Sequence, residues 1–360
     1  MEIKLLEPQI PEESKEYVND CIDTGWISYS GDYVKLLEDQ VKCFVRSESA
    51  VAMGSGTGAL WMILETLGIG PGDFVVVPTM TFVATVNAVT HTGATPVFVG
   101  CDDNLQMDVS FLKQAVDTLK PKAIIPVHML GNTCDMEAIK EIAQGKDHTA
   151  FIIEDATQAL GSRYLNTNKK VGCYGIASMF SFSFNKIIAA GQGGMAVTNH
   201  LKLGKQLKYL SLQAKDNAEM YKHDESGFNM GMSNLNAALA CGQMEYLSET
   251  LKQKRRVRDK YVELLGEENM YYQEGGNGWL NAYRSEGRNY RDISDRCKEA
   301  GIQTRPLFFP NHLQESFRGY PYFGDDLAVD KYWSTVCIPS SQNLTDEQIK
   351  YVVKSIRGDK

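Results

Sequence analysis

The chain has 360 residues, of which 43% are hydrophobic and 23% are charged, with a formal net charge of −8 and a pI near 5.4. This acidic balance argues against a general nucleic-acid binder, which needs clustered Lys and Arg to displace counterions from phosphates. No apolar run approaches the ~18 residues of a membrane span, and the start, MEIKLLEPQIPEESKEYV, lacks the basic and apolar regions of a secretion signal. The eight Cys contain no CxxC pair, which favours reduced cytoplasmic thiols over zinc sites or disulfides. We therefore expect a cytoplasmic globular protein without metal, long enough for two domains.

Short runs rich in β-branched residues alternate with helix-like stretches through the first two thirds of the chain. The predicted strands are 74–77, 96–99, 123–127, 151–153 and 178–182, and crossover helices are expected, for example, at 57–67 and 82–91. Near-continuous hydrophobicity is typical of strands that are covered on both faces. The pattern predicts an α/β domain with a mostly parallel sheet.

The pattern changes after about Leu247, where a charged helical run is followed by a Gly-rich break at 274–278. A helix at 292–300, a strand-like stretch at 301–309 and a closing helix at 345–356 are typical of a smaller α+β domain. We therefore predict a large domain over residues 1–247 and a small one over 248–360. The basic residues between Lys252 and Lys260 are interpreted as the solvated face of the helix.

Three segments contain residues that could carry chemistry, and the first is MGSGTGAL at 53–60. It lies between a predicted strand and a predicted helix. A loop of small residues there lets backbone N–H groups approach an anion such as phosphate, and the positive end of the helix adds attraction. The loop lacks the GKS or GKT ending of an NTPase P-loop, so a purely structural turn is an equal alternative for this segment alone.

The second segment is IIEDATQALGS, in which Asp155 follows an apolar run and so falls at the carboxyl end of a predicted strand. Ligands of open α/β sheets bind at that edge. A carboxylate there needs a cationic partner, because burial removes its hydration. Asp155 could pair with a protonated pyridine nitrogen, and the competing interpretation is a helix N-cap.

The third segment is FSFSFNKIIAAGQGGMAVT, where Lys186 follows a strand-like stretch and precedes small residues. Burying an ammonium costs several kcal/mol unless its pKa falls or it reacts, and a Schiff base removes that cost. The alternative is a surface Lys that extends its amine into water. Together the three segments offer a phosphate cradle, a carboxylate for a ring nitrogen and an amine for an aldehyde, which are the three handles of pyridoxal phosphate.

At this point the sequence resembles the nucleotide-sugar aminotransferases of the DegT/DnrJ/StrS group, which are built on the fold-type I aminotransferase architecture. The likeness extends almost from end to end. The strings that carry it are TGWISYSGDYV, GSGTGAL, PGDFVVVPTMTFVATVNAV, PVHMLGNTCDM, EDATQALGS, SFSFNK, GQGGMAVT, MSNLNAAL and GIQTRP. The resemblance implies a mostly parallel central sheet in a large domain and a smaller C-terminal α+β domain.

The resemblance also implies which residues hold pyridoxal 5'-phosphate. Lys186 would bond covalently to the cofactor and shuttle a proton, and Asp155 would bond the pyridine nitrogen. Gln158 would bond the ring hydroxyl, and Phe82 would stack on the ring. The residues expected at the phosphate are Ser55, Gly56, Thr57 and Ser181. Because members of this group work as homodimers with composite active sites, Asn229 is expected to reach the phosphate of the partner subunit.

The implied reaction moves an amino group from L-glutamate to a nucleotide-linked keto-sugar, for surface glycan biosynthesis. Relatives that dehydrate sugars carry His where Lys186 stands, so transamination is favoured. The strings NKII, LQAK, YKHDESGFN and NLNAALACGQME look closest to enzymes that aminate carbon 4 of UDP-linked 4-keto-6-deoxy-N-acetylhexosamines in bacillosamine or legionaminic acid pathways. The alternatives are a GDP-perosamine-type or dTDP-viosamine-type 4-aminotransferase, and a non-transaminating dehydratase or regulatory protein.

Some positions depart from the group's pattern, and others are interpreted from their place along the chain. Gly231 stands where an Arg is common, Gln192 stands where an acidic residue usually precedes paired glycines, and the chain is trimmed around 268–278. His128 is interpreted as a satisfied core or loop histidine rather than a catalyst. The residues expected to contact the nucleotide-sugar are Trp26, Ser28, Tyr29, Arg305 and His312.

Overall fold

The computed structural model describes residues 2–145, 148–165, 167–216, 220–285 and 287–358. Its centre is an eight-stranded sheet with the order β1-β7-β6-β5-β4-β2-β3-β10. All neighbouring pairs from β6 to β10 are parallel, whereas β7 runs antiparallel to both β1 and β6. The strands are β1 Ser49–Met53, β2 Phe74–Pro78, β3 Thr95–Val99, β4 Ala123–Ile124, β5 Phe151–Asp155, β6 Ala177–Ser181, β7 Gly194–Thr198 and β10 Tyr322–Phe323.

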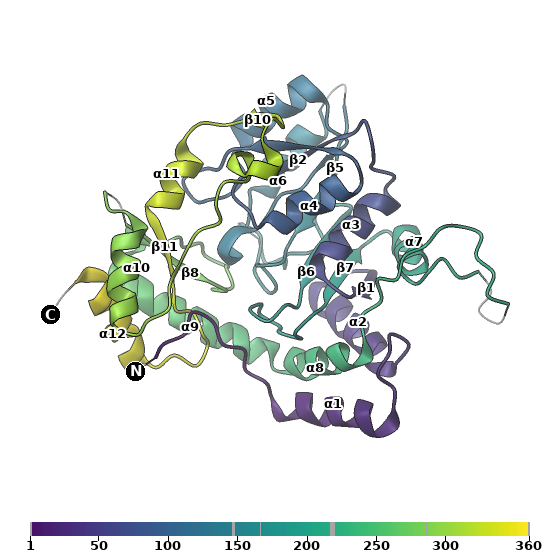
Figure 1. The fold of residues 1–360 in the computed structure, drawn as a ribbon, viewed down its shortest axis with the longest axis horizontal. Helices are drawn as coiled ribbons and strands as arrows, with labels where there is room; N and C mark the ends of the chain where they lie inside the picture. The colour runs from purple at the N-terminus through teal and green to yellow at the C-terminus, as the bar shows by residue number, and fades with distance from the viewer. Residues whose placement is uncertain (1, 146–147, 166, 217–219, 286, 359–360) are drawn as a thin grey trace.

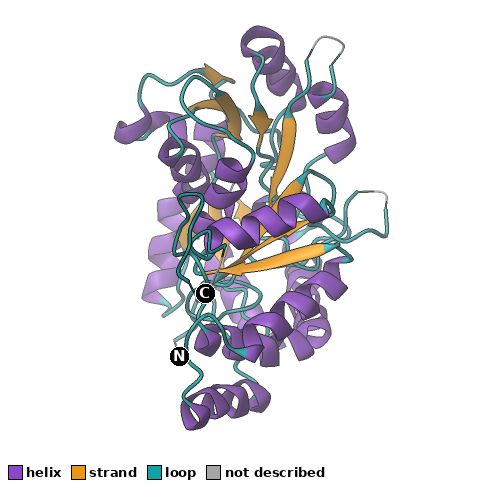
Figure 2. Ribbon diagram, turned by 90° about the vertical axis from the view of Figure 1, so that its right-hand side faces the viewer, coloured by secondary structure: helices purple, strands orange, loops and turns teal. Residues whose placement is uncertain are grey.

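Helices cover both faces of this sheet (Figures 1 and 2), which explains the continuous hydrophobicity of the strands. In β2, Val75 and Val77 pack with α3, α4 and α7, whereas Val76 points to the opposite face, among residues of α2, α5, α6 and α8. The expected fold class, a mostly parallel α/β sheet, is confirmed. The helices of this region are α1 Glu12–Thr24, α2 Asp32–Val45, α3 Gly56–Thr66, α4 Val83–His91, α5 Val109–Leu119, α6 Met136–Ala143, α7 Leu201–Ser211 and α8 Asn234–Glu245.

The predicted strands fall within a residue or two of the observed ones, except at 123–127. There β4 ends at Ile124, because Pro126 has no N–H with which to continue the ladder. Val127 still forms an isolated bridge to Asp155. Strand β4 therefore ends early, and the chain runs on beside the end of β5.

The C-terminal part contains a three-stranded antiparallel sheet in the order β8-β11-β9, with helices packed on it. The predicted division at 247/248 falls between α8 and α9 and stays a prediction. Strand pairing crosses that line among the described residues, since Ile3 bridges to Ile302 and β10 returns to pair with β3. The elements are α9 Leu247–Leu265, β8 Asn281–Arg284, α10 Tyr290–Glu299, β9 Arg305–Pro306, α11 Leu327–Trp333, β11 Thr335–Ile338 and α12 Asp346–Arg357, with short 3₁₀ turns at Met129–Gly131, Glu267–Asn269, Asn311–Leu313 and Glu315–Phe317.

The interpretation of the basic run as a solvated helix face is wrong for two of its residues. Lys254 and Arg258 are only 5% and 7% exposed. They lie on the buried stripe of α9 together with Leu251 and Tyr261, at the three- and four-residue spacing that places side chains on one helix face. Both donate hydrogen bonds to backbone carbonyls, which compensates part of the cost of burial.

Three further features bear on the sequence expectations. Among the described residues no helix is both long and apolar enough to cross a membrane. The same residues contain no cluster of three His, Cys, Asp or Glu side chains that could hold a metal ion. All eight Cys are free thiols, and of these only Cys43 is classed as exposed.

Candidate active site

A cavity of about 760 Å³ lies where the carboxyl ends of the parallel strands meet the C-terminal sheet. Its lining comes from four places in the large sheet: the β1–α3 loop, the turn between β2 and α4, the end of β5 and the segment after β6. Residues 303 and 305–308 close it from the C-terminal side. This is the edge at which open α/β sheets bind ligands.

The β1–α3 loop supplies a candidate anion-binding site in the wall of this cavity. The Oγ of Ser55 caps α3 by accepting a hydrogen bond from the Gly58 N–H at 3.0 Å. The first-turn N–H groups of Gly56 and Thr57 have no partner inside the helix, and they face the cavity with the positive end of the helix dipole. A Cβ at Gly56 would lie 2.8 Å from the Cβ of Ser181, so only glycine allows the loop to approach β6 this closely. The arrangement fits a phosphate group.

Asp155 lies at the end of β5 and is 3% exposed. One carboxylate oxygen accepts a hydrogen bond of 2.7 Å from the Thr85 hydroxyl in the first turn of α4. The other accepts from the hydroxyl and, at 3.1 Å, from the backbone N–H of Thr157. These bonds fix the orientation of a carboxylate that lines the cavity without a cationic hydrogen-bond partner among the described residues. A cationic group in the cavity, such as a protonated ring nitrogen, would stabilise this buried charge.

Lys186 lies in the segment that follows β6, and its side chain lines the same cavity. Its Nζ makes no hydrogen bond with any described residue, and it lies 4.2 Å from the centre of the Trp279 ring. The amine opens to the cavity, so the side chain is only half-buried. Protein atoms nevertheless surround it closely, and desolvation, partly offset by the charge of Asp155, lowers the pKa of Lys186 to about 8. An amine with this pKa can attack an aldehyde at physiological pH.

Two residues are placed to contact a planar ring between these groups. Phe82 is 55% exposed although it is a large aromatic, and it contributes its ring to the cavity lining. Gln158 is buried, and its Oε1 accepts a hydrogen bond from the Leu130 N–H at 2.8 Å. The amide nitrogen of Gln158 makes a weak hydrogen bond of 3.6 Å to the Met129 sulfur, and its second N–H is left to donate towards an oxygen on a ring bound in the cavity.

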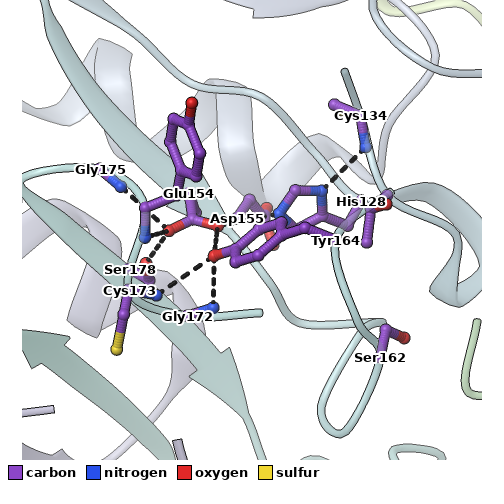
Figure 3. A network of polar contacts seen from close by, with 12 residues as sticks. His128, Cys134, Glu154, Asp155, Ser162, Tyr164, Gly172, Cys173, Gly175 and Ser178 are labelled. Atoms are coloured by element: carbon purple, nitrogen blue, oxygen red, sulfur yellow. Dashed lines mark hydrogen bonds and ion pairs between the residues drawn. The ribbon is translucent and has the colours of Figure 1, made fainter. Parts of the chain in front are cut away.

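Glu154, the residue before Asp155, supports the end of β5 from the opposite face (Figure 3). It is fully buried, and although burial opposes ionisation, hydrogen bonds from neighbouring groups hold the pKa of its carboxyl below the ordinary value. The carboxylate therefore carries a single buried negative charge with every lone-pair direction occupied. Its donors are the Nε2 of His128 at 3.1 Å, the hydroxyls of Tyr164 and Ser178 at 2.6 Å, and the N–H groups of Tyr174 at 2.8 Å and Gly175 at 3.2 Å.

His128 belongs to this network rather than to the cavity. Its Nδ1 accepts a hydrogen bond from the Cys134 backbone N–H at 3.2 Å, so Nε2 carries the ring proton and donates to Glu154. Its own N–H donates to the carbonyl of Asp155 at 3.2 Å. The prediction of a satisfied core histidine is confirmed.

The structure brings some of the predicted residues together and leaves others apart. Ser55, Gly56, Thr57, Phe82, Asp155, Gln158, Ser181, Lys186 and Arg305 all line the one cavity. His312 does not line it, because its ring stacks on Tyr322 at 3.8 Å and its Nδ1 hydrogen-bonds the Thr79 hydroxyl at 2.6 Å. The remaining predicted site residues are exposed and do not line the cavity, so their expected roles stay predictions. They are Trp26, Ser28, Tyr29 and Asn229.

The structure shows the surroundings of Gly231 and Gln192, the two residues that depart from the family pattern. A Cβ at Gly231 would lie 2.8 Å from the Leu212 side chain and 2.9 Å from the Cβ of Tyr29, so this packing does not admit a larger residue. Gln192 is exposed and lines the cavity, in a turn between glycines that both have positive φ. A neutral amide thus stands at the cavity wall where a carboxylate is common.

Three residues at the site were not predicted from the sequence. Thr85 and Thr157 hold the Asp155 carboxylate, and Trp279 contacts Lys186. Thr157 had a local signal, because it lies two residues after Asp155 at the end of a strand, where a side chain turns back readily. The sequence contains no local signal for Trp279, since this residue follows the Gly-rich break, far along the chain from Lys186.

Together these groups fit pyridoxal phosphate. The β1–α3 loop has room for a phosphate where only glycine fits, the buried carboxylate would be stabilised by a cationic ring nitrogen, and the desolvated amine lacks a hydrogen-bond partner among the described residues. Each of these three observations involves a different part of the cofactor, and all three lie on one cavity.

Comparison with known proteins agrees with this geometry. The model of the DegT/DnrJ/EryC1/StrS aminotransferase family matches residues 8–357. The chain is 36% identical over 360 residues to GDP-perosamine synthase from Escherichia coli O157:H7, covering 98% of this chain and 97% of that one. It is 32% identical over 369 residues to GDP-perosamine synthase from Vibrio cholerae, with coverages of 99% and 98%. The PLP form of Spr1654 from Streptococcus pneumoniae matches with a TM-score of 0.93 at 26% identity, covering 99% of this chain and 98% of that one.

Proposed function

The chain belongs to the DegT/DnrJ/EryC1/StrS aminotransferase family, and from this premise we propose that it transfers an amino group from L-glutamate to carbon 4 of a nucleotide-linked 4-keto-6-deoxy sugar. It is a pyridoxal-phosphate-dependent sugar aminotransferase that acts on nucleotide sugars. The donor, the position on the sugar and the nucleotide are the parts that we propose. The observation that carries the reaction type is that Lys186 and Asp155 line the same cavity as the proposed phosphate-binding loop.

When bound, pyridoxal phosphate supplies an aldehyde that carries the amino group and a ring that takes up negative charge from the reacting carbon. Lys186 would hold the cofactor through its aldehyde, and its free amine would remove and return the proton of the substrate carbon. Its lowered pKa suits both duties, because the amine gives and takes a proton near neutral pH. Asp155 keeps the ring nitrogen protonated, which increases the ring's capacity for negative charge.

Other residues of the cavity position and shield the reacting atoms. The N–H groups of Gly56 and Thr57 anchor the phosphate, and the ring of Phe82 covers one face and excludes water. Arg305 and Lys186 are the cationic side chains among the described residues that line this cavity. Because Lys186 acts at the reacting carbon, Arg305 is left to bind an anionic group, either a glutamate carboxylate or the diphosphate of the sugar nucleotide.

We favour a GDP-linked sugar as the acceptor. The support is that two relatives aligned over nearly their whole length are named GDP-perosamine synthases. This changes the order expected from the sequence strings, which placed UDP-linked 4-keto-6-deoxy-N-acetylhexosamines first. The dTDP-linked viosamine-type sugar remains the third candidate.

A panel of GDP-, UDP- and dTDP-linked 4-keto-6-deoxy sugars, each incubated with glutamate, tests the acceptor. Mass spectrometry of the sugar and assay of 2-oxoglutarate should show the highest kcat/KM with a GDP-linked sugar. A preference for another nucleotide would replace the GDP proposal and leave the reaction type intact. Failure of glutamate alone to bleach the visible band of the loaded protein would reject transamination from glutamate.

We further propose a homodimer in which Asn229 completes the phosphate site of the partner subunit. The support is that Asn229 is exposed and does not line the cavity of its own chain. Mixing a Lys186→Ala protein with an Asn229→Ala protein should then restore activity, because a hybrid dimer has one site with both residues intact. Mixed proteins that stay as inactive as the separate variants would refute the composite site.

A further inference from the structure

The segment that carries Lys186 is a thin wall between two cavities. Phe184, Asn185 and Lys186 line the active-site cavity and also a second one of about 470 Å³, which the N-terminal residues 6–13 and helices α8 and α9 enclose from the other side. A wall that faces a cavity on each side packs against few protein atoms. Its position therefore depends on specific contacts.

One hydrogen bond does much to fix the position of this segment. The indole N–H of Trp279 donates to the carbonyl of Asn185 at 2.6 Å. From Phe184 to Ile188, this is the one hydrogen bond that joins the segment to a described residue beyond positions 183–190. The next anchor along the chain is Ala189, whose backbone is held by Gln243 of α8.

Trp279 is itself fixed firmly enough to serve as an anchor. It is 2% exposed, and its backbone N–H donates to Asn277 Oδ1 at 2.8 Å. Its carbonyl accepts a hydrogen bond of 3.2 Å from Lys254, which donates a second of 2.7 Å to Ser340. Lys254 thereby joins helix α9 to the backbone of Trp279 and of Ser340, and burial lowers the pKa of Lys254 to about 7. A neutral amine can still donate both hydrogen bonds, so the anchor does not depend on the charge.

The face of the same indole ring lies under the reacting amine. The distance of 4.2 Å from Lys186 Nζ to the ring centre is within the range of a cation–π contact, which favours the ammonium over the free amine. Asp155 acts in the same direction by charge, while desolvation acts against both. Asp155 is the charged group that shifts the pKa of Lys186. Arg305 lines the same cavity, and Lys254 donates a hydrogen bond to the Trp279 carbonyl.

We propose that Trp279 is a positioning residue for Lys186, in which the indole N–H sets the place of the segment and the ring face sets the charge of the amine. This proposal rests on the role of Lys186 in the proposed function. It concerns the protein's own amine, however, and can be tested without any substrate.

The role of the indole N–H and the role of the ring face can be tested separately. Trp279 is replaced with analogues of nearly unchanged shape in the full-length protein freed of cofactor. Tetrafluorotryptophan keeps the N–H but removes the negative charge from the ring face. Benzothienylalanine keeps the ring but lacks the N–H. Pulse labelling with acetic anhydride across a pH series, followed by mass spectrometry, gives the pKa of Lys186, and amide hydrogen exchange of residues 184–188 reports the hold on the segment.

With tetrafluorotryptophan the pKa of Lys186 should fall by about half to one unit, with exchange of the segment unchanged. With benzothienylalanine the exchange should rise about five- to tenfold, as expected for loss of one hydrogen bond, while the pKa stays within about 0.3 of the original. The same analogues at Trp333, which stacks on Tyr290 away from the cavity, should change neither quantity. Unchanged values at Trp279, or equal changes at Trp333, would overturn the proposal, and neither result would touch the amino transfer tested with the sugar panel.

Discussion

Replacing Glu154 by Gln should lower the free energy of unfolding by about 3–5 kcal/mol, because the buried carboxylate has five hydrogen-bond donors and a carboxamide has one oxygen. The backbone N–H groups of Tyr174 and Gly175 can only donate, so the remaining oxygen must stay with them. The amide NH₂ then faces the Nε2–H of His128. That histidine cannot move its proton to Nδ1, because the Cys134 N–H already points there. A donor–donor contact therefore stays buried in the variant.

The expected loss can be read as a melting temperature. An unfolding entropy of about 2.1 cal/mol/K per residue gives roughly 0.8 kcal/mol/K for 360 residues, so the midpoint should fall by about 4–7 °C. Circular dichroism of the cofactor-free protein at pH 7 measures it. Glu141→Gln is the matched control, because Glu141 is exposed and should shift the midpoint by under about 1 °C. A midpoint for Glu154→Gln as close to the original as the control's would refute the reasoning.

The pH dependence gives a second check with a defined sign. The folded-state pKa of Glu154 is below its unfolded value, so its stabilisation is complete above about pH 4.5 and is lost as the pH falls through the folded pKa. Gln does not titrate. The difference in midpoint between the original protein and Glu154→Gln should therefore shrink on acidification, and a difference that grows would contradict the assignment of an ionised carboxylate.

Three further predictions concern the cavity. Gly56→Ala should weaken pyridoxal phosphate binding by at least about tenfold, because the added Cβ would lie 2.8 Å from that of Ser181. An unchanged Kd in a fluorescence titration would refute the assignment of this loop as the phosphate site. Thr85→Val should lower kcat about ten- to a hundredfold with little effect on the KM for glutamate, since Asp155 loses a fixing hydrogen bond; a change in KM alone would contradict this. The rate at which pyridoxal phosphate joins the cofactor-free protein should rise about tenfold per pH unit and level off near pH 8, because only the neutral amine of Lys186 reacts; stopped-flow absorbance that keeps rising to about pH 10 would show that the amine is not desolvated.

The residues that line the candidate cofactor site could be predicted from the sequence because each lies in a short contiguous string at the carboxyl end of a strand. Parallel strands bring those ends to one edge, so Gly56, Asp155 and Lys186 share a cavity although more than a hundred residues separate the first from the last. The local sequence pattern was enough to predict these residues, because the reactive residue types occur at the strand ends that the topology brings to one edge of the sheet.

The supporting residues could not be found in this way, because their roles depend on contacts between distant parts of the chain. Trp279 reaches Asn185 only after the chain has passed through α8, α9 and the Gly-rich break. The burial of Lys254 and Arg258 did leave a signal, namely their spacing with Leu251 and Tyr261 on one face of α9. Charge composition concealed it, since a basic run is ordinarily solvated.

The return of the chain from the C-terminal part to β3 has a practical consequence for cutting the protein in two. A fragment ending at residue 247 would lack β10 and present the bare edge of β3, with its unpaired N–H and C=O groups open to another molecule. The complementary fragment would lack Ile3, whose backbone joins Gly301 and Gln303, and would lose part of its own apolar centre. Each fragment therefore contains a segment that completes the fold of the other: β10 completes the large sheet, and Ile3 pairs with the C-terminal part. We expect the two fragments to be recovered in folded form only when they are produced together.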